Sequence, residues 1–155
     1  MEIRKAEFGD AEEISKIVID TIKNINSKDY SSEQIKVWVN SNSIENIRKK
    51  IQNKDRSTFV AIKNKEIVGY LAMYLMKNLL SSFYIKRENL GSGIGKKMII
   101  FAEGLAKERG LKELLLESTL TAYSFYKSQG YILVKKENHI QEGVKIPIIK
   151  MKKEL

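Results

Sequence analysis

The chain has no cysteine and only one histidine among its 155 residues. Without cysteine it can form no disulfide framework, no thiolate metal site and no cysteine nucleophile. It also lacks an apolar run long enough to span a membrane, and its N-terminus, with Glu2, Arg4, Lys5 and Glu7, lacks the apolar block of a signal peptide. We therefore expect a cytoplasmic protein with no membrane partner.

The length and the net charge of the chain limit its number of domains and the partners that it can bind. A chain of 155 residues can bury one ordinary core and is too short for two well-packed halves, so we expect a single domain over residues 1–155. Its 28 Lys and Arg against 19 Asp and Glu give a net charge of +9, which favours phosphates and acidic substrates over polyamines. The lysines are spread along the chain, which favours a solvated surface over a nucleic-acid-binding module, although that alternative stays open.

The most informative stretch runs from Leu80 to Glu117. Aromatic and β-branched residues near its start predict a strand around Phe83, Tyr84 and Ile85. Glycines follow at alternate positions, where they permit unusual φ angles and leave backbone N–H groups accessible. These are Gly91, Gly93 and Gly95.

A helix is predicted directly after this glycine turn, because apolar residues from Ile94 to Leu105 recur at three- and four-residue spacing. Gly110 is placed to end the helix, and Leu114–Leu116 predict the next strand. The first-turn N–H groups of a helix have no partner within it and carry partial positive charge. The turn is therefore suited to a phosphate or pyrophosphate, although a merely flexible turn also accounts for the glycines.

Two phosphate-binding motifs fail on spacing. A P-loop requires glycine at the position of Leu90 and a hydroxyl residue at the position of Lys97. The dinucleotide fingerprint starts correctly at Gly91 and Gly93, but Lys96 occupies its third glycine position. A P-loop and a nucleotide-binding oxidoreductase are therefore disfavoured.

The segment Leu90–Lys96, which reads LGSGIGK, resembles the R-G-x-G-I-G-K turn of the GNAT superfamily of acyl-CoA-dependent N-acetyltransferases. A second segment, Thr119–Tyr131, is similar to the N-x-x-A-x-x-L-Y-x-x-x-G-F motif of that family, with Tyr126 at the tyrosine position. The chain departs from the family at Leu90, where Arg or Gln is usual, and at Thr119, where Asn is usual.

The resemblance implies an α/β (α+β) fold with a mixed, mostly antiparallel sheet and helices on both faces. In that fold the strands before and after the glycine-turn helix are parallel and splayed, which agrees with the helical crossover between them. The resemblance also implies acetyl-CoA as co-substrate and no metal. The implied CoA-binding residues are Phe83, Tyr84, Ile85, Leu90, Gly91, Ser92, Gly93, Ile94, Gly95, Lys96, Thr119 and Tyr126.

The implied catalytic acid is Tyr126, whose family counterpart protonates the departing thiolate, a reaction that a phenol can perform. Tyr123 is a weaker candidate for the catalytic acid. The attacking amine must lose a proton, and Glu117, at the end of a predicted strand, is the candidate base. A chain of water molecules is an alternative, and His139 is expected in a solvent-exposed loop.

The remaining elements are predicted from capping and periodicity. Asp10 with Glu13 predicts a helix start, and Asn64-Lys65 predicts a tight turn between two strands. The predicted elements are a strand at Ile3–Ala6, a helix through Ile14 to Ile22, helices at Glu33–Val39 after a Ser31 or Ser32 cap and at Ile44 to about Gln52 after Ser43, strands at Phe59–Ile62, Ile67–Met76 and Leu80–Ile85, and a short helix at Thr121–Ser128.

The resemblance thus predicts an acyltransferase that moves an acetyl group from acetyl-CoA directly to a primary amine of a small molecule or peptide. It implies an acceptor site formed by the loops at about Asn24–Glu33 and Lys136–Val144, which Tyr30, Trp38 and His139 could reach. A non-catalytic acyl-CoA-binding regulatory domain stays an alternative. The acceptor and the oligomeric state, including a homodimer, stay open.

Overall fold

The computed structural model describes the whole chain, Met1–Leu155, and contains the elements in the predicted order. The strands and α-helices are β1 (Glu2–Lys5), α1 (Ala11–Asn24), α2 (Ser32–Asn40), α3 (Ile44–Gln52), β2 (Ser57–Lys63), β3 (Glu66–Tyr74), β4 (Leu79–Ile85), α4 (Ile94–Glu108), β5 (Glu113–Ser118), α5 (Tyr123–Ser128), β6 (Ile132–Gln141) and β7 (Val144–Glu154).

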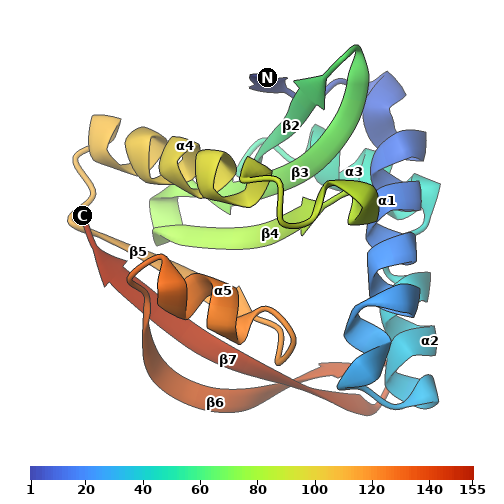
Figure 1. The fold of residues 1–155 in the computed structure, drawn as a ribbon. Helices are drawn as coiled ribbons and strands as arrows, with labels where there is room; N and C mark the ends of the chain where they lie inside the picture. The colour runs from blue at the N-terminus through green and yellow to red at the C-terminus, as the bar shows by residue number, and fades with distance from the viewer.

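The seven strands form one sheet in the order β1-β2-β3-β4-β5-β7-β6 (Figure 1). Every neighbouring pair is antiparallel except β4 and β5, which are parallel because α4 carries the chain across the sheet between them. This is the mixed, mostly antiparallel sheet that the family resemblance implies.

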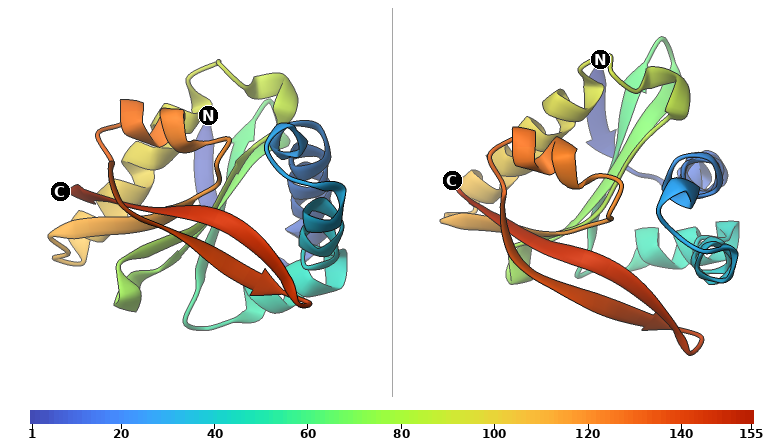
Figure 2. Two further views of the ribbon diagram at one scale, coloured as in Figure 1. Left: turned by 90° about the horizontal axis from the view of Figure 1, so that it is seen from below. Right: turned by 60° about the horizontal axis from the view of Figure 1, so that its bottom comes forward.

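Helices cover both faces of the sheet, with α4 and α5 on one face and α1, α2 and α3 on the other (Figure 2). Successive side chains of β3 point to opposite faces of the sheet and pack against the helices on each face, as strand geometry requires. Leu71 and Met73 belong to the core under α4, whereas Tyr70 and Ala72 pack with α1 and α3. None of the helices combines the length and apolarity needed to cross a membrane.

Several helix and turn signals act as the sequence predicts. Ser31 accepts a hydrogen bond from the backbone N–H of Gln34, and Ser43 caps α3 in the same way. Asn64 and Lys65 turn the β2-β3 hairpin with φ of 52° and 65°. Asp10 is the N-cap residue of α1, as predicted, but its carboxylate makes no capping hydrogen bond and instead pairs with Arg4 at 2.8 Å.

The parallel pair β4-β5 is connected only at its start. Leu79 pairs with Leu115 and Leu80 with Leu116, and the pairing then stops although both strands continue. Ser81 is the extra residue of a bulge in β4, since Ala72 pairs with Ser82 and Met73 with Leu80. Beyond this bulge the backbone edge of β4 that faces β5 is free of ladder hydrogen bonds, and Figure 1 shows the two strands diverging.

The last hairpin differs from the prediction. A loop was expected over Lys136–Val144, but β6 extends to Gln141 and the turn consists of Glu142 and Gly143, with φ of 48° and 75°. His139 therefore lies in β6, paired with Ile146 of β7, and not in a loop. Since strand pairing holds the backbone of His139, its side chain has a defined position relative to β5.

Candidate active site

The glycine turn enters α4 in the left-handed conformation. Gly91 and Gly93 have φ of 75° and 82°, and Gly93 is the N-cap of α4. A Cβ added at either glycine would meet no atom within 4 Å, so the space beside this backbone is open. Gly95 differs, because an added Cβ would lie 3.2 Å from the ring of Phe125 in α5. Its small size lets α5 pack against the first turn of α4.

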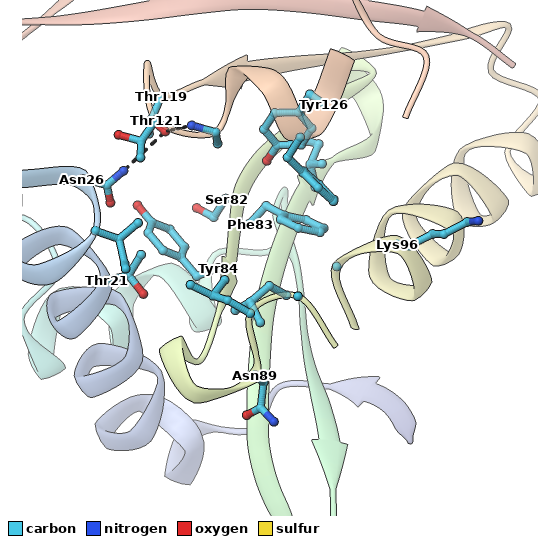
Figure 3. Close-up of a pocket in the computed structure, with 18 of the residues that line it drawn as sticks. Thr21, Asn26, Ser82, Phe83, Tyr84, Asn89, Lys96, Thr119, Thr121 and Tyr126 are labelled. Atoms are coloured by element: carbon cyan, nitrogen blue, oxygen red, sulfur yellow. Dashed lines mark hydrogen bonds between the residues drawn. The ribbon is translucent and has the colours of Figure 1, made fainter. Parts of the chain in front are cut away.

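A pocket of about 390 Å³ joins this turn to the gap between β4 and β5 (Figure 3). Most of the predicted residues line it: Phe83, Tyr84, Ile85, Leu90, Gly91, Gly93, Gly95, Lys96, Glu117, Thr119 and Tyr126. Ser92 and Ile94 do not, and Ile94 is buried in the core under α4. The fold thus brings residues from β4, α4, β5 and α5 to one cavity.

Tyr126, a residue of α5, is buried and still lines this pocket. Its ring lies 5.2 Å from that of Phe125 and 5.9 Å from that of Phe83, both edge-on, which holds the phenol in one orientation. Burial raises the pKa of Tyr126 above its ordinary value, and the nearby Tyr84 raises it further. The group therefore carries its proton at neutral pH. Tyr123, the rival candidate, does not line the pocket.

Phe83 and Tyr84 face opposite layers, as neighbours in a strand must. Phe83 stacks on Phe125 at 5.9 Å, whereas Tyr84 stacks on Tyr70 at 6.1 Å. Burial raises the pKa of Tyr84, so this phenol is also neutral. In Figure 3 the Tyr84 hydroxyl points toward Thr119 and Asn26.

A polar corner lies at that end of the pocket. Asn26, which follows α1, donates to the Thr119 hydroxyl at 3.4 Å, and that hydroxyl accepts the backbone N–H of Ala122 at 3.1 Å. Thr119 thus fixes the entry to α5. The buried side-chain oxygens of Asn26, Thr21 and Thr121 have no hydrogen-bond partner in the protein. These orphaned groups are available to a bound molecule.

A second pocket of about 170 Å³ adjoins the first, and Glu117 and His139 both line it. His139 Nε2 lies 2.9 Å from a carboxylate oxygen of Glu117. Trp38 also lines this pocket, as the sequence allowed. Tyr30 lines neither pocket, because its hydroxyl donates to the Pro147 carbonyl at 2.8 Å and thereby ties the segment before α2 to β7.

One cluster in this region offers ligand atoms of the kind that metals bind. The side chains of Glu117, Glu137 and His139 bring one such atom each within 4.8 Å of one another. Glu137, however, is already paired with Lys135 at 3.2 Å and Lys150 at 3.1 Å, and these two lysines lower its pKa. Because this carboxylate is neutralised by protein cations, the cluster offers a metal ion little uncompensated negative charge.

Comparison with known proteins agrees with this geometry. Residues 26–155 match the model of the acetyltransferase (GNAT) domain. The chain is 26% identical over 141 residues to a spermidine N(1)-acetyltransferase of Thermoplasma acidophilum, which covers 84% of this chain and 88% of the relative.

Solved structures resemble the whole chain. A GCN5-related N-acetyltransferase from Rhodopseudomonas palustris superposes with a TM-score of 0.91 at 21% identity, covering 99% of this chain and 95% of the other. The PaiA N-acetyltransferase of Thermoplasma acidophilum, solved in complex with coenzyme A, has a TM-score of 0.80 at 24% identity, with coverage of 99% and 98%.

None of these comparisons supports a non-catalytic or a nucleic-acid-binding module. The family model covers most of the chain, and the sheet, the parallel pair and the glycine turn all follow the pattern expected from the sequence. The chain belongs to the GNAT acetyltransferases and is an acyltransferase enzyme.

Proposed function

We propose that the enzyme binds acetyl-CoA in the pocket of about 390 Å³ and transfers the acetyl group directly to a primary amine of a small molecule. One observation carries the proposal: β4 and β5 stop pairing beyond Leu80, and the gap between them leads to the glycine turn, whose Gly91 and Gly93 are in the left-handed conformation. The named relatives support it, since one is a spermidine acetyltransferase and another was solved with coenzyme A.

The residues at the pocket fit the two parts of the coenzyme. The unpaired backbone edge of β4 at Phe83 to Ile85 offers hydrogen bonds to the pantetheine amides. Backbone N–H groups at Gly91 to Gly95, at the positive end of α4, suit the pyrophosphate. The space that side chains leave open beside Gly91 and Gly93 lets a phosphate approach that backbone. Lys96 lines the same pocket and adds a positive charge.

Acetyl-CoA supplies the thioester: a C–N bond forms to the amine and the C–S bond breaks. The nitrogen loses a proton and the sulfur gains one, so the protein needs an acceptor and a donor. Tyr126, protonated and in the pocket, is the proposed donor to the thiolate. Glu117 is the proposed acceptor of the amine proton, because it lines both pockets.

His139 is the proposed positioning residue for that carboxylate. With its Nε2 at 2.9 Å, the imidazole holds one Glu117 oxygen and leaves the other available to the amine. The sequence alone suggested no such pair, because the two residues lie far apart along the chain and the region of His139 was expected to be a loop.

Calorimetric titration with acetyl-CoA, followed by a screen of primary amines for release of free thiol, tests the proposal. We expect saturable binding and amine-dependent thiol release. The proposal is contradicted if millimolar acetyl-CoA gives no heat of binding and leaves the melting temperature of the protein unchanged. A ligand that binds only the native state must stabilise that state.

A further inference from the structure

Two basic side chains on the face of the sheet covered by α1 to α3 have no acidic partner. Arg56, just before β2, is 6% exposed, and its guanidinium donates to the hydroxyls of Thr58, Tyr70 and Ser82 at 2.7–3.1 Å. Lys50, in α3, donates from Nζ to the Asn42 side-chain oxygen at 2.9 Å and to a backbone carbonyl at 3.2 Å. All of these partners are neutral, so both charges are uncompensated.

Lys50 opens onto the second pocket, of about 170 Å³. That pocket shares Ser81, Ser82, Tyr84, Glu117 and Thr119 with the proposed acetyl-CoA pocket. It is therefore placed to hold the molecule that receives the acetyl group. Arg56 does not line it, but Arg56 is hydrogen-bonded to Ser82, which lines both pockets.

The two sides of the second pocket have opposite chemistry. Glu117 and His139, from β5 and β6, supply the carboxylate and imidazole that suit an amine. Lys50 and Asn42, from the helical layer, supply an ammonium and an amide. Burial, with the charge of Arg56, lowers the pKa of Lys50 to about 8, and the hydrogen-bond partners of its ammonium are uncharged. A bound anion would supply the missing charge.

The size of the pocket limits the occupant. Its volume of about 170 Å³ is below the roughly 300–1,000 Å³ common for drug-sized ligands, so a small molecule fits and an oligosaccharide does not. A polyamine would place a second ammonium against Lys50. The net charge of +9 also repels polycations and attracts acidic molecules.

We propose that the acceptor is a small amine that also carries a carboxylate, as an amino acid does, and that its carboxylate pairs with Lys50 while its amine faces Glu117 and His139. This inference rests on the proposed function, since it assigns the acceptor of that reaction. It distinguishes the enzyme from its spermidine-acetylating relative, whose substrate is a polycation.

Matched amines test the assignment. Thiol release is measured with the common α-amino acids, with the decarboxylated amine of each, and with spermidine, at one acetyl-CoA concentration. We expect at least one amino acid to exceed its decarboxylated partner and spermidine in kcat/KM. Lys50→Met should lower kcat/KM for that amino acid by about 10- to 100-fold, the range for one lost charge-assisted hydrogen bond, and should lower kcat/KM for its decarboxylated amine far less, because that amine has no carboxylate to pair with Lys50.

Lys49→Met is the matched control, because Lys49 is the exposed neighbour of Lys50 in α3. Lys50→Arg keeps the charge and should restore part of the preference. Two results would overturn this inference alone. One is a higher kcat/KM for spermidine or the decarboxylated amines than for every amino acid. The other is a preference for amino acids that Lys50→Met leaves intact. Absence of both acetyl-CoA binding and thiol release with any amine would overturn the proposed function as well.

Discussion

The imidazole of His139 and the carboxylate of Glu117 lie 2.9 Å apart, between the edge strand β6 and the end of β5. Strand β7 separates β5 from β6 in the sheet, so the two side chains meet across a strand that contributes neither of them. Both line the second pocket. The only histidine of the chain thus belongs to the proposed acceptor side of the site.

The first prediction concerns this pair. Glu117→Gln should lower kcat by about 100-fold or more, the lower end for loss of a general base, because an amide cannot accept the ammonium proton. His139→Ala should lower kcat less, by about tenfold, since Glu117 keeps its carboxylate but loses its orientation. Both effects are measured by thiol release at saturating acetyl-CoA.

Glu113→Gln is the matched control for that pair of variants. Glu113 lies in the same strand, and its carboxylate is 3.7 Å from Lys152 at the surface. It should keep wild-type kcat. A Glu117→Gln enzyme as fast as wild type would show that water, and not this carboxylate, removes the proton.

The second prediction concerns Tyr126. Tyr126→Phe should lower kcat by about 100- to 10,000-fold while the Kd for acetyl-CoA stays within a factor of two or so, because only the proton donor is lost. Burial raises the pKa of the phenol, so the wild-type donor stays protonated across neutral and mildly alkaline pH. Calorimetry and thiol release measure the two quantities.

Tyr123→Phe, in the same short helix but outside the pocket, should leave both quantities unchanged. If Tyr126→Phe weakened acetyl-CoA binding as strongly as it slowed turnover, Tyr126 would be a packing residue of the pocket and not its acid.

The third prediction contrasts two glycines of the α4 region. Gly93→Ala should destabilise the fold by about 1–2 kcal/mol, because φ at this N-cap is 82° and a side chain is strained there. Gly104→Ala, in the middle of α4 with no atom within 4 Å of the new Cβ, should stabilise by about 0.5–1 kcal/mol. Urea unfolding compares the free energies.

The same two variants should differ in their affinity for acetyl-CoA. Gly93→Ala places a methyl group beside the backbone proposed to hold the pyrophosphate and should weaken acetyl-CoA binding, whereas Gly104→Ala should not. Equal affinities for the two variants would argue that the phosphates bind elsewhere.

The fourth prediction concerns the buried cation at Lys50. Its pKa is about 8 in the fold against an ordinary value of 10.5, so between these values the unfolded chain holds more protons than the native one. Stability contributed at this site therefore rises with pH across that window and is constant below it. Relative to Lys50→Met, the wild type should gain about 2 kcal/mol between pH 7 and pH 9.5, because about 1.5 pH units of that window lie between the two pKa values.

Urea unfolding of both proteins at the two pH values measures that gain, and other titrating groups cancel in the difference. A constant difference between wild type and Lys50→Met would mean that Lys50 keeps its charge and is well solvated. Adding the amino acid identified in the acceptor screen should reduce the gain, because a bound carboxylate favours the charged lysine.

Much of the fold could be predicted from neighbouring residues. The caps at Ser31 and Ser43, the turn at Asn64 and the glycine turn into α4 depend on groups only a few positions apart. Such signals are local, since a side chain, a missing side chain or an allowed φ angle acts on the adjacent backbone. Asp10 occupies the predicted N-cap position of α1, but it makes no capping hydrogen bond because Arg4, in β1, competes for its carboxylate.

By itself, then, the sequence determined the order of the elements, the phosphate-suited turn and the candidate acid Tyr126. Only the tertiary structure decided where β4 leaves β5, that His139 meets Glu117, and that Lys50 and Arg56 lie without acidic partners. These features join residues remote in the chain. Their positions depend on strand register, on a bulge at Ser81 and on how the helical layer packs, and no local pattern of residues encodes those distances.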